Sequence, residues 1–274
     1  MAYKRILTIQ DISCVGQCSM TVALPILSAC GHETCILPTA VLSTHTGGFG
    51  KPAVVHLDGA VEPVWHHWQE NGISFDAILV GYIGNAEGVQ RVGEIAENLL
   101  APDGLLIVDP AFADHGRIYS GLNADYAREM EYLCRRADII LPNVTEAALL
   151  TGLPYRERAD EGYLRELADG LRDFGVKGAI ITGFMWDDTH TGFYGYDRRE
   201  GNFSYRAKRI PKSLHGTGDL FAATFAGGLV AGKDMGTAAA VAAHFVERVV
   251  AATPEASPFG AEFEGQLSWL IAQI

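Results

Sequence analysis

The segment Gly216-Thr217-Gly218-Asp219 places two glycines and an acidic residue directly before a stretch of helical pattern. Glycine lets the backbone turn tightly and brings bare N–H groups close to a ligand. The first amides of a helix have no partner within it, and the helix dipole adds positive potential, so an anion fits there. The Asp219 carboxylate would repel a bound phosphate unless its role is to accept a proton. A carboxylate beside an anion site is the arrangement expected of a general base in phosphoryl transfer to an alcohol. In a second interpretation, Asp219 caps the helix and the glycines form a turn.

Another glycine-rich segment, residues 227–234, fits the spacing of a phosphate-binding loop except at its last position, where Asp234 replaces Ser or Thr. It also follows a predicted helix, whereas such a loop follows a strand. We therefore expect Gly232 to be a helix C-cap rather than part of a phosphate site.

Two segments place acidic residues at the ends of apolar runs of strand length. Asn143 and Glu146 follow the run 137–141, and Asp109 ends another run and precedes Pro110. Open α/β sheets bind ligands at this edge, which favours a place for Glu146 and Asp109 beside Mg²⁺ and the phosphates of ATP. Two alternatives stay open, a capping box formed by Asn143 and Glu146 and an ordinary turn at Asp109.

Two further loops carry groups suited to a flat heteroaromatic ring. The polar loop 42–49 follows the run 33–38 and contains His45 and Thr46, and Tyr82 ends a later run. These side chains could grip a ring that bears a few polar substituents. A lone histidine is more commonly structural, so His45 alone decides nothing.

Composition limits the class of protein. The net charge of −12 argues against non-specific binding to nucleic acid or to an anionic membrane. Five cysteines in no metal-like spacing indicate reduced thiols of a cytoplasmic protein. The first apolar run is too short for a signal peptide, and no apolar stretch approaches the roughly 20 residues that cross a bilayer.

The order of elements predicts the fold. Continuous apolar runs such as 77–80 and 105–108 are typical of a parallel sheet buried on both faces. Their alternation with amphipathic segments predicts a doubly wound, three-layer α/β domain. The predicted strands are 4–9, 33–38, 76–82, 104–109, 137–141 and 177–182, and the helices between them are 18–30, 60–71, 86–99, 122–135, 144–151 and 160–174.

The pattern changes after residue 183. Residues 191–196 and 202–208 flank a turn-like segment and predict an antiparallel hairpin on the sheet edge. Three helices then follow, at 218–231, 235–252 and 260–273. No linker or repeat interrupts the chain, so we predict one domain over residues 1–274.

Taken together and in this order, the segments resemble the ribokinase-like superfamily, and within it the pyridoxal/pyridoxamine kinases of vitamin B6 salvage. The similarity extends over nearly the whole chain, from about residue 4 to residue 252. Gly-Thr-Gly-Asp is shared across the superfamily, whereas the Ser-Thr-His-Thr-Gly loop with Gly-Tyr-Ile-Gly is far more specific to B6 kinases. The residues that carry the resemblance are 9–13 with Gly16, 38–49, 81–84, Asp109-Pro110, Pro142-Asn143 with Glu146, and 216–219.

The resemblance implies a three-layer ribokinase-like fold in which Asp219 deprotonates the 5′-hydroxyl of pyridoxal, pyridoxine or pyridoxamine. Gly216, Thr217 and Gly218 would form the anion hole. Members of the family are cytoplasmic homodimers that use ATP and Mg²⁺, often with a monovalent cation such as K⁺. The resemblance assigns Mg-ATP to Asp109, Asn143 and Glu146, with Asp109 and Glu146 toward the metal. It implies that the nucleotide contacts Thr182, Gly183, Lys212, Ser213, Leu214 and His215. The pyridoxal ring would contact His45, Thr46 and Tyr82.

The chain departs from the family pattern near its start. Many relatives have serine after Ile-Gln, in contact with the ring, where this chain has Asp11. Ser13 could take that place if the register of the loop shifts. An acidic Asp11 near the ring would favour a protonated pyridine or the amine of pyridoxamine.

Four other functions compete with this one. A kinase for the hydroxymethylpyrimidine of thiamin synthesis is close enough that some enzymes act on both rings. Sugar and nucleoside kinases usually carry a large β-sheet lid, for which residues 10–60 are too short. A non-catalytic vitamin or nucleotide sensor has no need of Asp219, and a dinucleotide-binding oxidoreductase lacks its glycine motif after the first strand.

Overall fold

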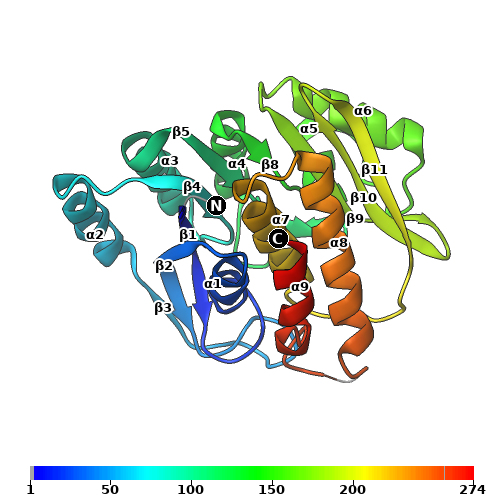
Figure 1. Ribbon diagram of the computed structural model, residues 1–274, viewed down its shortest axis with the longest axis horizontal. Helices are drawn as coiled ribbons and strands as arrows, with labels where there is room; N and C mark the ends of the chain where they lie inside the picture. The colour runs from blue at the N-terminus through cyan, green and yellow to red at the C-terminus, as the bar shows by residue number, and fades with distance from the viewer. Residues whose placement is uncertain (1–2, 256) are drawn as a thin grey trace.

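A nine-stranded sheet forms the centre of the computed structural model, which describes residues 3–255 and 257–274 (Figure 1). Its strand order is β11-β10-β9-β8-β5-β4-β1-β2-β3. Neighbours from β9 to β2 are parallel, whereas β3, β10 and β11 pair antiparallel. The strands of this sheet are β1 (Arg5–Ser13), β2 (Glu33–Leu42), β3 (Val54–His56), β4 (Phe75–Val80), β5 (Leu100–Val108), β8 (Ile139–Ile140), β9 (Gly178–Asp187), β10 (His190–Asp197) and β11 (Gly201–Lys208).

Helices cover both faces of the sheet and give the three layers that the sequence predicts (Figure 1). One face carries α1 (Met20–Ala29), α7 (Thr217–Val230), α8 (Met235–Ala252) and α9 (Leu267–Gln273). The other carries α2 (Asp58–Glu70), α3 (Ala86–Leu99), α4 (Ala124–Arg136), α5 (Val144–Thr151) and α6 (Glu161–Arg172).

The first strand shows why these runs form a sheet buried on both faces. Leu7 and Ile9 point into the core beneath α2 to α6, whereas Ile6 points into the core beneath α1, α7 and α8. All three are fully buried. Because successive side chains of a strand alternate between faces, a strand between two helical layers needs an uninterrupted apolar run.

Several elements differ from the sequence prediction. The short strands β3, β6 (Ala113–Asp114) and β7 (Arg117–Ile118) were not expected, and β9 continues to Asp187, so β9 to β11 form a three-stranded antiparallel edge. The predicted helix 260–273 begins only at Leu267, after a 3₁₀ turn. Its first residues instead join a loop, in which the Ala261 amide donates to the His215 carbonyl at 3.0 Å. One domain over residues 1–274 stays a prediction.

The helix α8 also corrects an expectation. By length and composition alone it could cross a bilayer, although no such stretch was expected. It packs against α7 and β10 as part of a covering layer. Ala242, Phe245 and Val249 are fully buried on its inner side, which accounts for its apolar composition.

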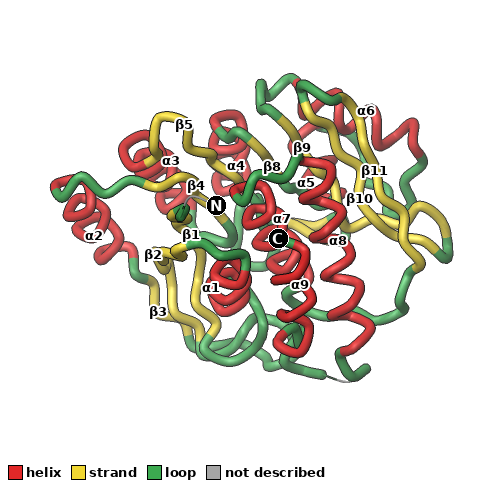
Figure 2. Tube along the Cα trace, viewed as in Figure 1, coloured by secondary structure: helices red, strands yellow, loops and turns green. Residues whose placement is uncertain are grey.

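The loops after the parallel strands share one edge of the sheet. They follow β1, β2, β4, β5 and β8, and those after β1 and β2 lie at the lower side of the view in Figure 2. The segment before α7 reaches the same edge, because the His215 ring lies 4.8 Å from that of His45 in the loop after β2. Ligand sites of open α/β sheets lie at this edge.

Candidate active site

The start of α7 is shaped by Gly216. This residue is the helix N-cap with a left-handed φ of 82°, and a Cβ there would lie 1.9 Å from the Gln17 carbonyl oxygen. The Leu220 amide makes the first helical hydrogen bond, to the Gly216 carbonyl at 2.9 Å, so the amides of residues 217–219 precede the ladder. A Cβ on Gly218 would meet no atom within 4 Å. The helix start therefore presents donors and the positive end of its dipole to open space, as an anion requires.

Asp219 lies in the first turn of this helix and is partly buried. Burial and the negative charge of Asp11 raise the pKa of its carboxyl to about 7, although a hydrogen bond from the Ser19 backbone acts in the opposite direction. Ser19 holds an unusual positive φ of 52°. A carboxyl that titrates near neutrality is well suited to take a proton from an alcohol.

Glu146 is buried and accepts three backbone hydrogen bonds. Its Oε1 accepts from the amides of Phe112 (2.8 Å) and Ala113 (3.3 Å), and its Oε2 accepts from the Asn143 amide (2.9 Å). Asn143 Oδ1 accepts in return from the Glu146 amide at 3.0 Å, which completes the capping box that begins α5. Glu146 therefore joins α5 to the loop after β5, while its place near magnesium-bound water stays a prediction.

Asp109 follows β5, and its amide donates to the Val80 carbonyl at 2.9 Å. Burial raises the pKa of its carboxyl well above the usual value, and the charges of Glu146 and Asp219 raise it further. The pKa of Glu146 is also raised by burial. Three carboxyls thus act on one another at the sheet edge, and a bound cation would relieve their repulsion.

This cluster fits Mg²⁺ held jointly by protein and substrate. Among residues 3–255 and 257–274, no group of three or more His, Cys, Asp or Glu is placed to hold a metal ion. Mg²⁺ commonly binds one or two carboxylates and takes its other oxygens from phosphate and water. Asp109 and Glu146 match that requirement, and their role as metal ligands stays a prediction.

Asp11 and Ser13 lie on the same face of β1, beside Asp219. Both are buried, and the Ser13 hydroxyl donates to Asp11 Oδ2 at 3.3 Å. Burial raises the pKa of the Asp11 carboxyl. Burial also raises the pKa of the neighbouring Tyr82 phenol, and the charge of Asp11 raises it further. The Asp11 amide also donates to the Tyr82 carbonyl at 3.2 Å. The structure thus brings together both candidates for the ring contact and the tyrosine predicted to line the pocket.

His45 is buried with unused polar atoms. Its exposed fraction is 3%, and neither ring nitrogen has a hydrogen-bond partner among the described residues. Burial lowers its pKa, and the neighbouring His215 lowers it further. A neutral imidazole with two free nitrogens suits a ligand with a polar substituent. Thr46, the next residue, is exposed at the same loop.

The segments predicted to line the nucleotide site also reach this edge. The Thr182 amide donates to the Pro142 carbonyl at 3.1 Å, and Gly183 is left-handed, with φ of 70°. A Cβ on Gly183 would lie 3.0 Å from the Asn143 Cβ. Both residues therefore lie beside the start of α5, next to Glu146.

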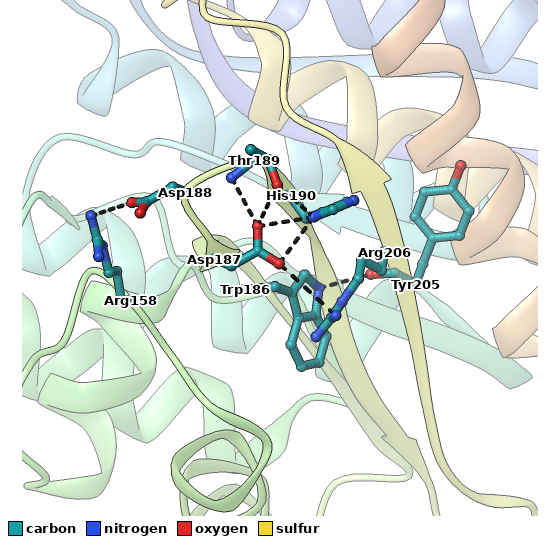
Figure 3. Close-up of polar contacts among 8 residues, drawn as sticks. All are labelled: Arg158, Trp186, Asp187, Asp188, Thr189, His190, Tyr205 and Arg206. Atoms are coloured by element: carbon teal, nitrogen blue, oxygen red, sulfur yellow. Dashed lines mark hydrogen bonds and ion pairs between the residues drawn. The ribbon is translucent and has the colours of Figure 1, made fainter.

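The strand that carries Thr182 continues to a turn fixed by polar contacts (Figure 3). Asp187 Oδ1 accepts from the Thr189 amide at 2.8 Å and lies 2.9 Å from His190 Nδ1. The backbone and His190 contacts hold the pKa of Asp187 below its usual range. Behind the turn, the Arg206 guanidinium lies 4.8 Å from the centre of the Trp186 ring. These contacts define the turn between β9 and β10.

The segment 212–215 approaches the start of α7 from β11. Ser213 and His215 are exposed, and Leu214 is partly buried. The Thr217 hydroxyl donates to the Leu214 carbonyl at 3.4 Å. The Lys212 ammonium donates to backbone carbonyls of the α8 terminus, at 2.7 Å for Thr253. The predicted contacts of these four residues with a nucleotide stay predictions.

Comparisons with known proteins agree with this geometry. A family model described as phosphomethylpyrimidine kinase matches residues 28–263, which is most of the chain. The chain belongs to the phosphomethylpyrimidine kinase family.

Solved and curated relatives extend this assignment. Pyridoxal kinase from Lactobacillus plantarum is 34% identical with a TM-score of 0.89, and the alignment covers 98% of this chain and 97% of that one. A "putative phosphomethylpyrimidine kinase" from Bacteroides thetaiotaomicron, in a crystal form with pyridoxal, is 32% identical with a TM-score of 0.92, covering 98% and 96%. A "putative pyridoxal kinase" of Schizosaccharomyces pombe is 27% identical over 226 residues, 80% of this chain, which spans 65% of that protein. The predicted membership of the ribokinase-like B6 kinases and the predicted fold class are confirmed.

Tyr119 was not among the site residues predicted for this member of the phosphomethylpyrimidine kinase family. Burial raises the pKa of its phenol, and the charges of Glu146, Asp114 and Asp109 raise it further, so the phenol lies near the carboxyl cluster. The turn at Asp114 and Gly116, which folds β6 onto β7, brings Tyr119 there. The signal for it in the sequence is the polar stretch Asp114-His115-Gly116-Arg117, which begins four residues after Pro110.

Proposed function

We propose that the protein transfers the terminal phosphoryl group of ATP to the 5′-hydroxymethyl group of pyridoxal, pyridoxamine or pyridoxine. The observation that carries this proposal is the position of Asp219. It stands at the unpaired start of α7, close enough to both other carboxyls that its charge raises the pKa of Asp109 and the charge of Asp11 raises its own. A phosphoryl donor bound at Asp109 and an alcohol bound at Asp11 would meet at Asp219.

Each group then has a defined part in the reaction. Asp219 accepts the proton of the 5′-hydroxyl as its oxygen attacks the terminal phosphorus, and ADP leaves on the opposite side. The amides of residues 217–219 stabilise the negative charge of the phosphoryl group during transfer. Mg²⁺ bound with ATP supplies positive charge to the phosphate oxygens, and Asp109 and Glu146 would hold it or its water.

On the ring side, the buried groups orient the vitamer. His45 offers two free imidazole nitrogens, and Asp11 with Ser13 offers a paired carboxyl and hydroxyl. Tyr82 borders the same space, because the Asp11 charge acts on its phenol. Fixing the ring in one orientation places the 5′-oxygen next to the base, which accounts for much of the rate of such a reaction.

The test is a direct assay of purified protein with Mg-ATP and four alcohols: pyridoxal, pyridoxamine, pyridoxine and hydroxymethylpyrimidine. We expect stoichiometric ADP and a 5′-phosphate from the B6 vitamers. Phosphorylation of hydroxymethylpyrimidine alone would overturn the proposal in favour of the second candidate below.

The variant Asp219→Asn tests the role of the base. We expect it to keep its affinity for ADP and to lose kcat by roughly 10²-fold or more, as for removal of a general base. Near-normal turnover would contradict the assigned role.

Hydroxymethylpyrimidine kinase activity is the second candidate, and the family model that matches residues 28–263 favours it by its description. The two rings differ at the atoms that would face Asp11 and His45, so the ratio of kcat/KM for the two alcohols separates the candidates. A non-catalytic sensor would bind a vitamer and ATP and release no ADP.

We also propose a cytoplasmic homodimer. The edge strand β3 supports an association surface, because Val54 and Val55 are 43% and 60% exposed, and exposed apolar edges commonly pair with another chain. Light scattering after size-exclusion chromatography of the wild type and Val55→Lys tests this. A monomeric wild type would refute it.

A further inference from the structure

The Lys212 side chain is enclosed by backbone oxygens at the end of α8. Its ammonium donates to the carbonyls of Val250 (3.1 Å), Ala251 (3.3 Å) and Thr253 (2.7 Å). The last carbonyls of a helix have no partner within it, and they form the negative end of the helix dipole. A cation at this place therefore satisfies three oxygens together and meets a favourable potential.

The carbonyls that hold Lys212 are tied to the anion hole by a continuous chain of hydrogen bonds. The Thr253 hydroxyl accepts from the Glu262 amide at 3.0 Å. The adjacent Ala261 amide donates to the His215 carbonyl, also at 3.0 Å. His215 precedes Gly216, whose backbone packs against Gln17. Lys212 and His215 thus hold the two ends of one short segment, the first by hydrogen bonds to the end of α8 and the second by a hydrogen bond from Ala261.

Between Lys212 and His215 the segment is largely exposed. Ser213 is exposed, and only the partly buried Leu214 packs the segment against the core. A short segment with a single partly buried side chain depends strongly on the hydrogen bonds at its ends. The geometry of the amides at residues 217–219 therefore depends on the cation beside Val250, Ala251 and Thr253.

Backbone carbonyls grouped around one positive charge are also the ligand set of a monovalent metal ion. In this chain the ammonium of Lys212 already occupies that set. A K⁺ ion would have to displace three charge-assisted hydrogen bonds, each of which stabilises the folded loop.

We propose that Lys212 is a tethered cation that takes the place of a monovalent metal ion at the end of α8, and that it positions the segment before the anion hole. In this role Lys212 is a positioning residue. It acts on the phosphates through Thr253, Ala261 and His215. The inference rests on the proposed function in assigning ATP to this loop, and it predicts a kinase that does not need K⁺.

The experiment measures ADP affinity by calorimetry and Tm by calorimetric scanning in K⁺, NH₄⁺, Na⁺ and tetramethylammonium chloride at equal ionic strength. Equal ionic strength removes general screening as a cause. For the wild type we expect the same Kd and Tm in all four salts. A wild type that binds ADP severalfold more tightly in K⁺ than in tetramethylammonium would overturn the proposal, and this arm needs no variant.

The variant Lys212→Ala vacates the carbonyls and leaves room for an ion. In tetramethylammonium we expect its affinity for ADP to fall by roughly tenfold or more, the loss expected for charged hydrogen bonds. K⁺ or NH₄⁺ should restore most of that affinity. An equal loss in every salt, or no loss, would overturn the proposal, because a purely structural lysine would give no ion-dependent rescue.

The matched control is Lys208→Ala. Lys208 is an exposed lysine at the end of β11, and its ammonium has no hydrogen bond among the described residues. Its removal changes the net charge equally and should leave affinity and salt response unchanged. Both readouts are free of turnover, so the inference can stand even if no B6 vitamer is phosphorylated, and the kinase assay can succeed even if Lys212 proves irrelevant.

Discussion

The imidazole rings of His45 and His215 lie 4.8 Å apart, with their planes inclined by 53°. The contact joins the loop predicted to hold the vitamer to the residue before the anion hole. Gly47 makes the approach possible, because a Cβ there would lie 2.1 Å from His215 Cε1. A displacement of either loop would therefore move the other. His45 lies between the predicted vitamer site and the residue before the anion hole.

The variant His45→Phe keeps an aromatic ring and removes both nitrogens. Since those nitrogens have no protein partner, we expect the loss to fall on the vitamer, with its KM raised roughly tenfold for one lost hydrogen bond. The KM for ATP should change little. Steady-state kinetics with His67→Phe, an exposed histidine of α2, provide the control, and an unchanged vitamer KM would remove His45 from the pocket.

Variants of Asp11 and Ser13 distinguish which of the two side chains contacts the ring. Asp11→Asn removes a negative charge from a buried place, so we expect kcat/KM for pyridoxamine to fall more than that for pyridoxal. Ser13→Ala removes a hydroxyl and keeps the charge, and it should affect both vitamers alike. If the ratio of the two vitamers is the same in Asp11→Asn as in the wild type, the Asp11 carboxyl does not contact the amine or the ring nitrogen.

The two glycines of the anion hole should respond differently to alanine. Gly216→Ala forces a Cβ against the Gln17 carbonyl in a left-handed conformation, and we expect lower stability and weaker ADP binding together. Gly218→Ala meets no protein atom and adds helix propensity, so its Tm should not fall. Its affinity for ADP should still drop if phosphate occupies the open space. Urea denaturation and calorimetry separate the two effects, and normal ADP affinity in Gly218→Ala would place the phosphates elsewhere.

The buried Glu146 carboxylate accepts three amides. Glu146→Gln turns one acceptor into a donor that faces an N–H, so we expect a loss of about 1–3 kcal/mol in the free energy of unfolding. The urea midpoint measures it, with Glu94→Gln at an exposed position of α3 as control. A shift of the Mg²⁺ activation curve in the same variant would support the predicted role of Glu146 at the metal. An unchanged urea midpoint would contradict its structural role.

The sequence predicted the sheet and its covering layers because the causes are local. The run 77–80 is apolar without interruption, which a strand between two helical layers requires. The capping box of Asn143 and Glu146 is likewise readable from spacing alone. Glu146 also bonds Phe112 and Ala113, a contact with a distant loop that no local pattern contains.

The parts of the site that were not predicted depend on tertiary contacts. Lys212 was assigned to the nucleotide by resemblance, and its ammonium was found on the end of α8, a position fixed only once the helix has packed. The start of α9 moved to Leu267 because the preceding residues bond to His215. Helical pattern alone cannot weigh that competing contact.

The pKa of Asp219 links stability to activity. Its folded value of about 7 exceeds the ordinary aspartate value near ~3.9, so the folded state binds more protons than the unfolded state between the two. The contribution of this group to stability is therefore fully present below pH about 4 and is lost as the pH rises through about 7. Asp219→Asn does not ionise, so its Tm relative to the wild type should increase between pH about 5 and about 8.

The same ionisation should govern the rate. The base must be deprotonated to accept the hydroxyl proton, so kcat/KM for the vitamer should fall as the pH drops below about 7. The control for both measurements is Asp103→Asn at an exposed position of β5, whose Tm should follow that of the wild type at every pH. A Tm difference between Asp219→Asn and the wild type that is constant with pH would show that Asp219 titrates at its ordinary value. The fall in rate would then have to come from another group.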